Sequence, residues 1–255
     1  MTQASHLSSL PRSGDLEPSF IARHQAVWAR KPALRWYYEH EIFGRLLGAL
    51  PTGRTLELGS GPGFFRRHLA DVVSTDVSPI RGVDMVADAH NLPFASSSFA
   101  AVTAIDVLHH LASPKRALAE CARVLRPGGR AAFVEPWAGA FGGLMYKYAH
   151  HEDCSFVDRP WDQVAPPGKD PMDGNAAVSR MLFGDGGVGL AEHVPGMRLN
   201  AVEHFGVASY LITGGFQRWG LPRPVVEAAA RVEGLLPRGL AMQLALRVLI
   251  VIERT

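Results

Sequence analysis

The chain has 255 residues, a length that fits one α/β domain or one domain carrying an inserted lid. Lys and Arg number 26 against 24 Asp and Glu, the net charge is +2, and no long basic run occurs, so nucleic acid is not an expected partner. Two cysteines without a C-x-x-C pair exclude a disulfide framework, and no stretch reads as a signal peptide or a membrane span. We therefore expect a cytoplasmic protein without membrane insertion.

The N-terminal part divides into two segments. Residues 1–18 are polar and rich in serine, which predicts a flexible leader, so the folded domain is expected to cover residues 19–255. Residues 20–50 read as helix and carry several aromatic side chains, among them Trp36, Tyr37 and Tyr38. Packing against a core sheet is the simplest interpretation of these aromatic residues.

The stretch TLELGSGPGFF, residues 55–65, combines a short apolar run with a glycine-rich turn. The apolar run predicts a buried parallel strand. Glycine lacks a Cβ and lets the backbone approach a ligand closely. From Phe65 the spacing of apolar residues, with Leu69 and Val72, predicts a helix. A strand that passes through such a turn into a helix is typical of nucleotide-cofactor sites. The three glycines stand at alternate positions: Gly59, Gly61 and Gly63.

The spacing of the turn distinguishes between cofactors. A dinucleotide site needs a small residue at the sixth position of G-x-G-x-x-G, where this chain has Phe64. Glu57 stands two residues before the first glycine, and its charge would repel a pyrophosphate but suit a cofactor with an ammonium and a sulfonium group. Residues 56–64 thus resemble motif I of the class I S-adenosylmethionine (SAM) dependent methyltransferases.

Three further acids follow at the ends of expected strands. Asp76 ends a second strand about twenty residues after Glu57. From this position a carboxylate can accept hydrogen bonds from ribose hydroxyls. The alternative is that Asp76 serves as an N-cap or turn residue before Ser78. Residues 85–94 resemble the family's third strand and turn, which implies that Asp88 bonds the adenine amino group. The fourth strand and its loop cover residues 98–111, and the resemblance implies backbone contacts from Asp106 to the methionine part of the cofactor.

The segment RVLRPGGR, residues 123–130, is a further family marker, between a helix that opens at Ser113-Pro114 and a fifth strand at residues 131–135. The resemblance covers roughly residues 54–136. It implies an α/β fold: a Rossmann-like doubly wound, seven-stranded, mostly parallel sheet whose last strand is antiparallel. The family's N-terminal helices often cover the cofactor, so closure of Trp36, Tyr37 or Tyr38 over it is the alternative to packing. The residues that the resemblance assigns to SAM binding are Glu57, Gly59, Ser60, Gly61, Gly63, Asp76, Val77, Asp88, Ala89, Ile105 and Asp106.

After Pro136 the resemblance weakens. Residues 137–195 are rich in Gly and Pro and read as an insertion after the fifth strand, where the family builds its acceptor pocket or a lid. Beyond it we expect a strand at residues 197–205, a helix at 222–236 and the last strand at 246–253.

Methyl transfer from a sulfonium is a direct in-line displacement in which the protein mainly aligns donor and acceptor. A hydroxyl acceptor also benefits from a general base, most often histidine. Four histidines are candidates, each with packing or a solvated surface cluster as the alternative: His109, His110, His150 and His151. No metal is expected, because the adjacent residues of 150–154 would not converge on one ion.

The sequence therefore predicts methyl transfer from SAM to a small-molecule acceptor, at oxygen in preference to nitrogen or carbon. A nicotinamide-dependent oxidoreductase is the alternative that Phe64 opposes, and a non-catalytic SAM-binding protein is a third class. The Asn/Asp-Pro-Pro-Tyr/Phe motif of enzymes that methylate macromolecules is absent after the fourth strand, which favours a small acceptor. The acceptor and the oligomeric state stay open.

Overall fold

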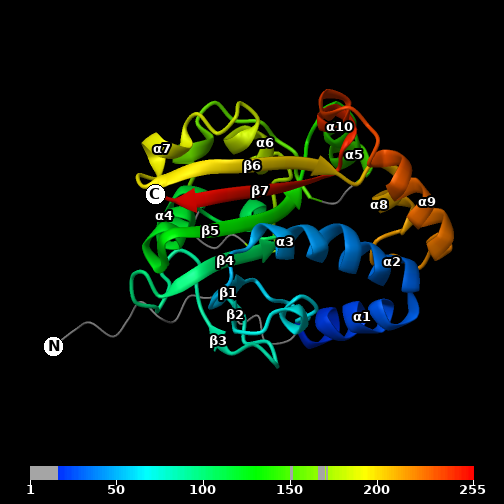
Figure 1. Ribbon diagram of the computed structural model, residues 1–255. Coiled ribbons are helices and arrows are strands. Elements are labelled where there is room, and N and C mark those ends of the chain that lie inside the picture. Colours follow the sequence, from blue (N-terminus) through cyan, green and yellow to red (C-terminus); the bar gives the residue numbers. More distant parts are fainter. Residues whose placement is uncertain (1–16, 150–151, 166–169, 171) are drawn as a thin grey trace.

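A computed structural model of the chain describes residues 17–149, 152–165, 170 and 172–255. The expected leader, apart from its last two residues, lies outside these ranges, as do His150 and His151. One seven-stranded sheet forms the centre, in the order β3-β2-β1-β4-β5-β7-β6 (Figure 1). Its strands are β1 Thr55–Leu58, β2 Val72–Asp76, β3 Met85–Val86, β4 Phe99–Ile105, β5 Leu125–Pro136, β6 Met197–Phe205 and β7 Arg247–Arg254.

The sheet is parallel from β3 through β5, and β7 runs antiparallel to both of its neighbours. In the register of β7, Val251 lies opposite Ala132 of β5 and Ile250 lies opposite Val202 of β6. This arrangement confirms the predicted doubly wound α/β class with an antiparallel last strand inserted between the fifth and sixth.

Helices and short helical turns connect the strands. Before the sheet come α1 Glu17–Arg30, α2 Pro32–Tyr37, the π-helical turn η2 Tyr38–Phe43 and α3 Gly44–Ala49. The loop after β4 holds the 3₁₀ turn η4 Leu108–His110, which is followed by α4 Pro114–Val124. The later elements are α5 Ala140–Ala149, η5 Pro160–Asp162, α6 Val178–Phe183, α7 Leu190–His193, α8 Ala208–Ile212, α9 Arg223–Glu233 and α10 Arg238–Leu244. No helix among the described residues is long and apolar enough to cross a bilayer.

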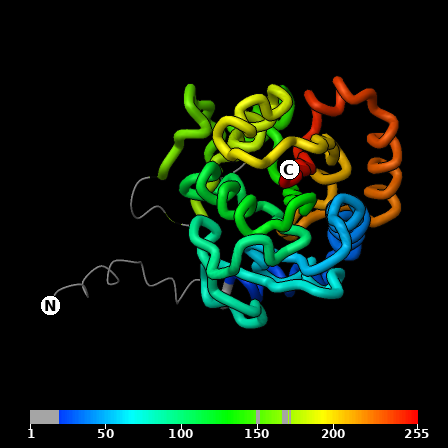
Figure 2. The backbone as a smooth tube through the Cα atoms, turned by 60° about the vertical axis from the view of Figure 1, so that its left-hand side comes forward, coloured from blue at the N-terminus to red at the C-terminus, as the bar shows by residue number. Residues whose placement is uncertain are grey.

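Alternate side chains of the central strands pack on opposite faces of the sheet. On β5, Ala131 and Phe133 join the core that α4 and residues 161–197 cover, whereas Ala132 and Val134 join the core under the N-terminal helices. Figure 2 shows the N-terminal helices (blue) and the green-to-yellow segment after β5 on opposite sides of the molecule. Both faces are covered, as a mostly parallel sheet requires.

The helix expected from Phe65 is wrong. Only a 3₁₀ turn, η3 Arg66–His68, follows the glycine turn, and Val72 already belongs to β2. Leu69 is extended, and the Thr55 N–H bonds the carbonyl of Asp71 at 2.9 Å, so the chain has returned to the sheet by that point. The glycine turn occupies the first part of the connection, residues 59–63, so few residues are left for a helix before Asp71 rejoins the sheet.

Candidate active site

The ends of β1, β2, β4 and β5 and the start of β7 meet at one edge of the sheet. Parallel strands end at the same edge, and the antiparallel β7 begins there. Arg247, the first residue of β7, therefore lies opposite Pro136 of β5 and Phe205 of β6. Arg247, from the C-terminal part of the chain, thus lies at the same edge of the sheet as the predicted acids at the strand ends.

The geometry of the turn after β1 explains why its residues are glycines. Gly59, Gly61 and Gly63 all have positive φ, at 61°, 49° and 72°. A Cβ on Gly59 would lie 2.4 Å from Cγ2 of Val107, in the loop after β4. The turn therefore needs left-handed backbone and also close contact with the neighbouring loop, and glycine meets both needs.

Two predicted acids lie beside this turn. Glu57 is buried, and its Oε2 accepts a hydrogen bond from Oγ of Ser60 at 2.7 Å. Burial raises the pKa of Glu57 to about 7, against the smaller opposing effect of the Ser60 hydrogen bond. Asp76 accepts hydrogen bonds from the N–H of Gly61 at 3.0 Å and of Ser78 at 3.1 Å. The ends of β1 and β2 are thereby connected through the turn, and burial also raises the pKa of Asp76.

The third predicted acid lies further out. The exposed carboxylate of Asp88 accepts hydrogen bonds from the backbone N–H of His90 at 2.9 Å and pairs with its Nδ1 at 2.6 Å. Ala89 is buried. Val77 and Val86, by contrast, are each 53% exposed near the ends of β2 and β3. Val86 pairs with Asp76 in the sheet, and Val77 directly follows Asp76, so both exposed side chains belong to residues next to this acid.

A buried ion pair that the sequence analysis did not predict lies at the end of β4. Nη1 of Arg247 is 2.6 Å from Oδ1 of Asp106, and the Arg247 side chain is 3% exposed. Burial lowers the pKa of Arg247, but the Asp106 charge outweighs it and holds that pKa well above its usual value. Nε and Nη2 of Arg247 have no hydrogen-bond partner among the described residues. Asp106 itself has a left-handed φ of 57°, which turns its side chain sharply out of the strand.

Buried and partly buried tyrosines lie near this pair. The Cζ of Arg247 lies 5.4 Å from the ring centre of Tyr210, and the rings of Tyr37 and Tyr210 are 5.5 Å apart. Burial raises the pKa of Tyr38, Tyr146 and Tyr210, and the nearby charge of Asp106 adds to the shift in each. Tyr37 and Tyr38 belong to the core under the N-terminal helices, as the simpler interpretation of the aromatic residues predicted.

A histidine–carboxylate pair lies behind the loop after β4. Nδ1 of His109 is 2.6 Å from Oε2 of Glu135, which is fully buried at the end of β5. The other oxygen of Glu135 accepts hydrogen bonds from the N–H groups of Val107 at 3.0 Å and Leu108 at 2.8 Å. Burial lowers the pKa of His109, but the Glu135 charge outweighs it and raises this pKa to about 9. Glu135 was not predicted, because its apolar neighbours indicated only a strand.

The segment after β5 brings a carboxylate to both histidines of η4. Glu152 Oε2 lies 3.3 Å from Nε2 of His109, and Glu152 Oε1 lies 3.6 Å from Nε2 of His110. A Cβ on Gly174 would lie within 3.0 Å of both imidazole rings. The Asn175 N–H donates to the carbonyl of His109 at 3.0 Å, and burial lowers the pKa of His110. Residues 152 and 174–175 therefore close around His109 and His110.

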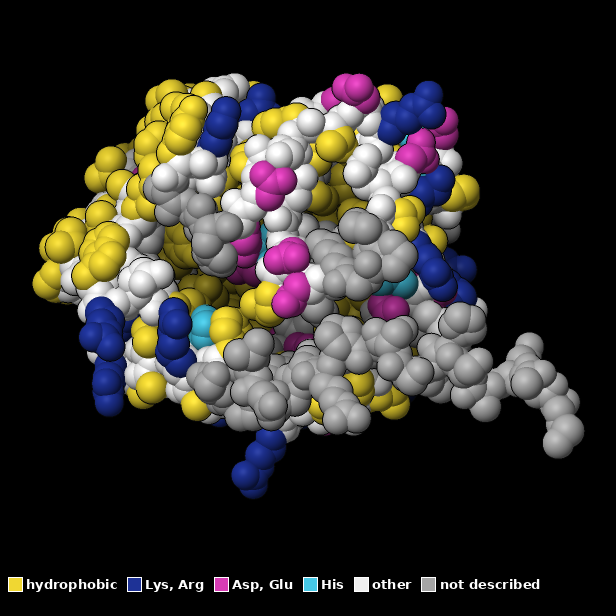
Figure 3. All heavy atoms as spheres, turned by 180° about the vertical axis from the view of Figure 1, so that it is seen from behind, with side chains coloured by type: hydrophobic (Ala, Val, Ile, Leu, Met, Phe, Trp, Pro, Cys, Tyr) yellow, Lys and Arg dark blue, Asp and Glu magenta, His cyan; other side chains and the backbone are white. Residues whose placement is uncertain are grey.

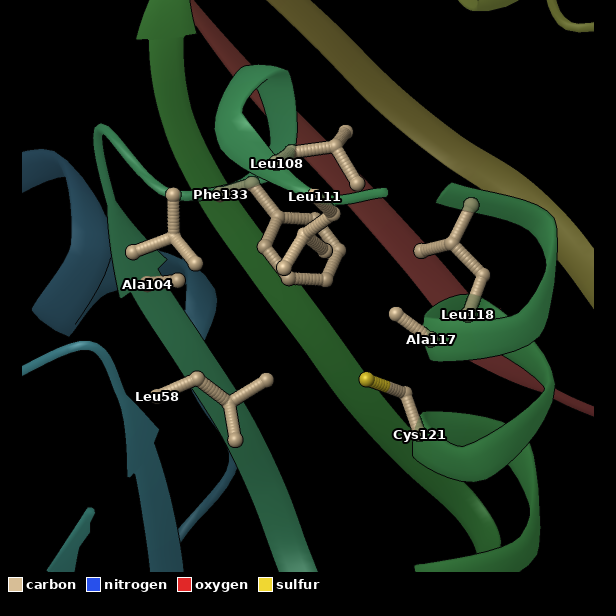
Figure 4. Close-up of a pocket in the computed structure, with 9 residues that line it drawn as sticks. Leu58, Ala104, Leu108, Leu111, Ala117, Leu118, Cys121 and Phe133 are labelled. Atoms are coloured by element: carbon tan, nitrogen blue, oxygen red, sulfur yellow. The ribbon is translucent and has the colours of Figure 1, made fainter. Parts of the chain in front are cut away.

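The apolar space shown in Figure 4 is a different feature. It lies between the sheet and α4 and is lined by Leu58, Ala104, Val107, Leu108, Leu111, Ala117, Leu118, Cys121 and Phe133. The Cys121 side chain points into it, and burial raises the pKa of the Cys121 thiol to about 12, so the thiol stays protonated. This space is a gap in the hydrophobic core without polar groups for chemistry.

A second space, partly polar, borders His109 on the side of residues 137–195. Gln163, Asn175 and Met181 contribute to its wall. Figure 3 shows the molecule from behind, with a hollow lined mainly by hydrophobic side chains and with acidic side chains beside it. The segment after β5 therefore contributes side chains to concave surface near η4.

The fold, with its glycine turn between Glu57 and Asp76, is typical of α/β proteins that bind a nucleotide cofactor. Residues 56–133 match the methyltransferase domain family. The crystal structure of a SAM-dependent methyltransferase from Thermotoga maritima superposes with a TM-score of 0.55 at 17% identity, over 93% of this chain and 97% of that one, which supports the fold. Over residues 56–133 the chain is therefore similar to the methyltransferase domain family, and the fold agrees with that similarity.

Two curated relatives are demethylmenaquinone methyltransferases. The protein from Renibacterium salmoninarum is 37% identical over 119 residues, 40% of this chain and 50% of that protein. The protein from Beutenbergia cavernae is 40% identical over 110 residues, 36% of this chain and 46% of that protein. The chain thus spans about half the length of the curated relatives it matches, and the similarity leaves most of this chain uncovered.

Proposed function

We propose that this protein transfers a methyl group from SAM to a small-molecule acceptor. The observation that carries the proposal is the turn after β1. Its glycines have positive φ angles, which favour glycine, and the turn lies between Glu57 and Asp76. The fit to the cofactor rests on chemistry: Asp76 offers carboxylate oxygens for ribose hydroxyls, and Val77 offers exposed apolar surface for a base. Glu57 offers a carboxyl whose ionised form suits a positive ligand.

The further contacts follow from the sequence resemblance. Gly59, Ser60, Gly61 and Gly63 would surround the methionine part, with Ile105 and Asp106 contributing backbone, and Asp88 and Ala89 would hold the adenine. When bound, SAM supplies an electrophilic methyl group on a sulfonium. The chain's own contribution is to hold an acceptor in line with that group and to exclude water.

We further propose that the acceptor lies between the end of β4 and residues 137–195 and is methylated at a hydroxyl. Buried Tyr146 and partly buried Tyr210 lie close enough to Asp106 and Glu152 for these charges to act on their pKa, after the larger effect of burial. A hydroxyl must lose its proton during transfer; of the two histidines beside Glu152, His110 is the better base, because burial lowers its pKa whereas the Glu135 charge raises the pKa of His109 to about 9. Methylation at nitrogen or carbon is the alternative. Because the two curated relatives are named demethylmenaquinone methyltransferases, a quinone-type compound is the first acceptor to try in a test of carbon methylation.

Isothermal titration with SAM tests the cofactor part. Asp76→Ala should bind SAM at least about tenfold more weakly, since hydrogen bonds to a charged group contribute about 1.5–3 kcal/mol. Asp71→Ala is the matched control, because Asp71 is an exposed acid next to the opposite end of β2. Equal affinities for wild type and Asp76→Ala would contradict the assignment.

The methylated atom is tested with carbon-13-methyl SAM and separate sets of phenols, amines and quinols. The carbon-13 chemical shift of the transferred methyl distinguishes oxygen, nitrogen and carbon products. Turnover of phenols alone would support hydroxyl methylation. Turnover confined to amines, or a carbon-methylated quinol, would contradict it.

A further inference from the structure

We infer that His109, His110 and Glu152 form a binding site for a divalent transition-metal ion of the zinc class. The three side chains come from two separate segments, the η4 turn and the start of the segment after α5. One ligand atom from each can be chosen so that all three lie within 4.8 Å of one another. Metal binding at this place does not depend on the proposed methyl transfer.

The distance from each imidazole nitrogen to its nearest oxygen of Glu152 fits metal ligation better than a short charge-assisted hydrogen bond. Nε2 of His109 and Oε2 of Glu152 are 3.3 Å apart, and Nε2 of His110 and Oε1 of Glu152 are 3.6 Å apart. Charge-assisted N–H···O bonds are about 2.7–2.9 Å long. Ligand bonds of about 2.0–2.2 Å in tetrahedral geometry put neighbouring ligand atoms roughly 3.3–3.6 Å apart.

The surroundings of His109 are those of a metal ligand. Its Nδ1 lies 2.6 Å from buried Glu135, which leaves Nε2 to face Glu152. A ligating histidine usually donates its other ring N–H to a carboxylate or carbonyl, which fixes the ring orientation. Glu135 is held in turn by the N–H groups of Val107 and Leu108. The sheet therefore fixes His109 from behind.

The opposite wall is also held in place. Asp153, next to Glu152, forms a β-bridge with Asn175, and the N–H of Asn175 bonds the carbonyl of His109. Gly174 lies so close to both imidazole rings that a Cβ would meet them. Two nonlocal hydrogen-bonded contacts thus bring Glu152 to the histidines, which adjacent residues of 150–154 alone would not achieve.

The ligand set selects the class of ion. Two imidazoles and one carboxylate suit Zn²⁺ or Co²⁺, whereas Mg²⁺ and Ca²⁺ prefer oxygen ligands. Three protein ligands leave a fourth position open for water or an oxygen of the acceptor. If the proposed hydroxyl methylation holds, the ion would bind the acceptor oxygen and ease the loss of its proton. This role rests on the proposed function, whereas the binding itself does not.

The test uses the full chain, stripped with a chelator and dialysed against Zn²⁺ alone, with metal content measured by mass spectrometry and affinity by titration. We expect one Zn²⁺ per chain and no comparable binding of Mg²⁺. Glu152→Gln and His110→Ala should each weaken Zn²⁺ binding by at least about 10–100-fold, the loss typical even of a supporting carboxylate. Co²⁺ should give the visible absorption of a four-coordinate site without thiolate.

Matched controls come from α7, where Glu192 and His193 are adjacent but lie outside the metal-ligand cluster. Glu192→Gln and His193→Ala should bind Zn²⁺ as the wild type does. Circular dichroism verifies the fold of every variant, and the two ligand variants at partly accessible positions avoid replacing fully buried His109. Absence of stoichiometric Zn²⁺, or unchanged affinity in both Glu152→Gln and His110→Ala, would overturn the inference. SAM binding, measured separately, is unaffected by either result.

Discussion

The buried pair of Arg247 and Asp106 gives a sharp prediction because its two members differ in burial. Arg247 is 3% exposed, whereas the side chain of Asp106 is 33% exposed. Asp106→Asn leaves the buried guanidinium of Arg247 without a counter-charge. Nε and Nη2 of this guanidinium already have no hydrogen-bond partner among the described residues. Removing one partner of a buried pair costs about 3–5 kcal/mol. Asn also tolerates the left-handed backbone of position 106, so strain does not confuse the result.

Arg247→Met should cost less than half as much, since water reaches the remaining carboxylate and Met fills much of the volume. For a chain of this size, 3–5 kcal/mol corresponds to a fall in Tm of roughly 6–20 °C for Asp106→Asn. The double variant Asp106→Asn with Arg247→Met should melt above Asp106→Asn alone, because the orphaned cation is gone.

Thermal unfolding without ligand measures these differences. Arg223→Met, which removes an exposed ion pair with Glu227, is the control and should leave Tm unchanged. Two results would refute the reasoning. One is a Tm for Asp106→Asn within about 2 °C of wild type, and the other is a double variant that melts below Asp106→Asn.

Two further predictions concern the turn after β1. Burial raises the pKa of Glu57 above its usual value, so the native state binds this proton more tightly than the unfolded state does. The resulting contribution to the free energy of unfolding is complete below about pH 4.5 and is lost as pH rises through about 7. Glu57→Gln should reduce this decline, by about 3 kcal/mol at most, in urea titrations at pH 5 and pH 8; equal slopes with pH would contradict the assignment. Gly59→Ala should lower Tm more than Gly61→Ala, because only the first Cβ meets Val107 while both carry left-handed strain. Gly128→Ala, with positive φ and open space, isolates the strain alone, and equal shifts in all three variants would exclude the contact with Val107.

The sheet was predictable because its signals are local. Short apolar runs with an acid within or directly after them predicted β1, β2 and β4, and the expected strand at residues 197–205 is confirmed as β6. The helix after Phe64 was wrong because the apolar spacing of Phe65, Leu69 and Val72 also fits a turn followed by a strand. Apolar spacing alone does not separate these two structures over so few residues.

The site was only partly predictable, because its missing members are nonlocal. Arg247 stands out in an apolar strand, but only the antiparallel insertion of β7 brings it to Asp106. Glu135 likewise becomes a partner of His109 only through the pairing of β4 with β5. The roles of His150 and His151 stay predictions, since both lie outside the described residues.

The measurement that tests the central claim most directly is a crystal structure of the protein with S-adenosylhomocysteine, the demethylated product of SAM. We expect its ribose hydroxyls on the carboxylate of Asp76, its amino acid part over the turn at Gly59 and Gly61, and its base against Val77. Density for the ligand at another edge of the sheet, or none at saturating concentration, would contradict the account.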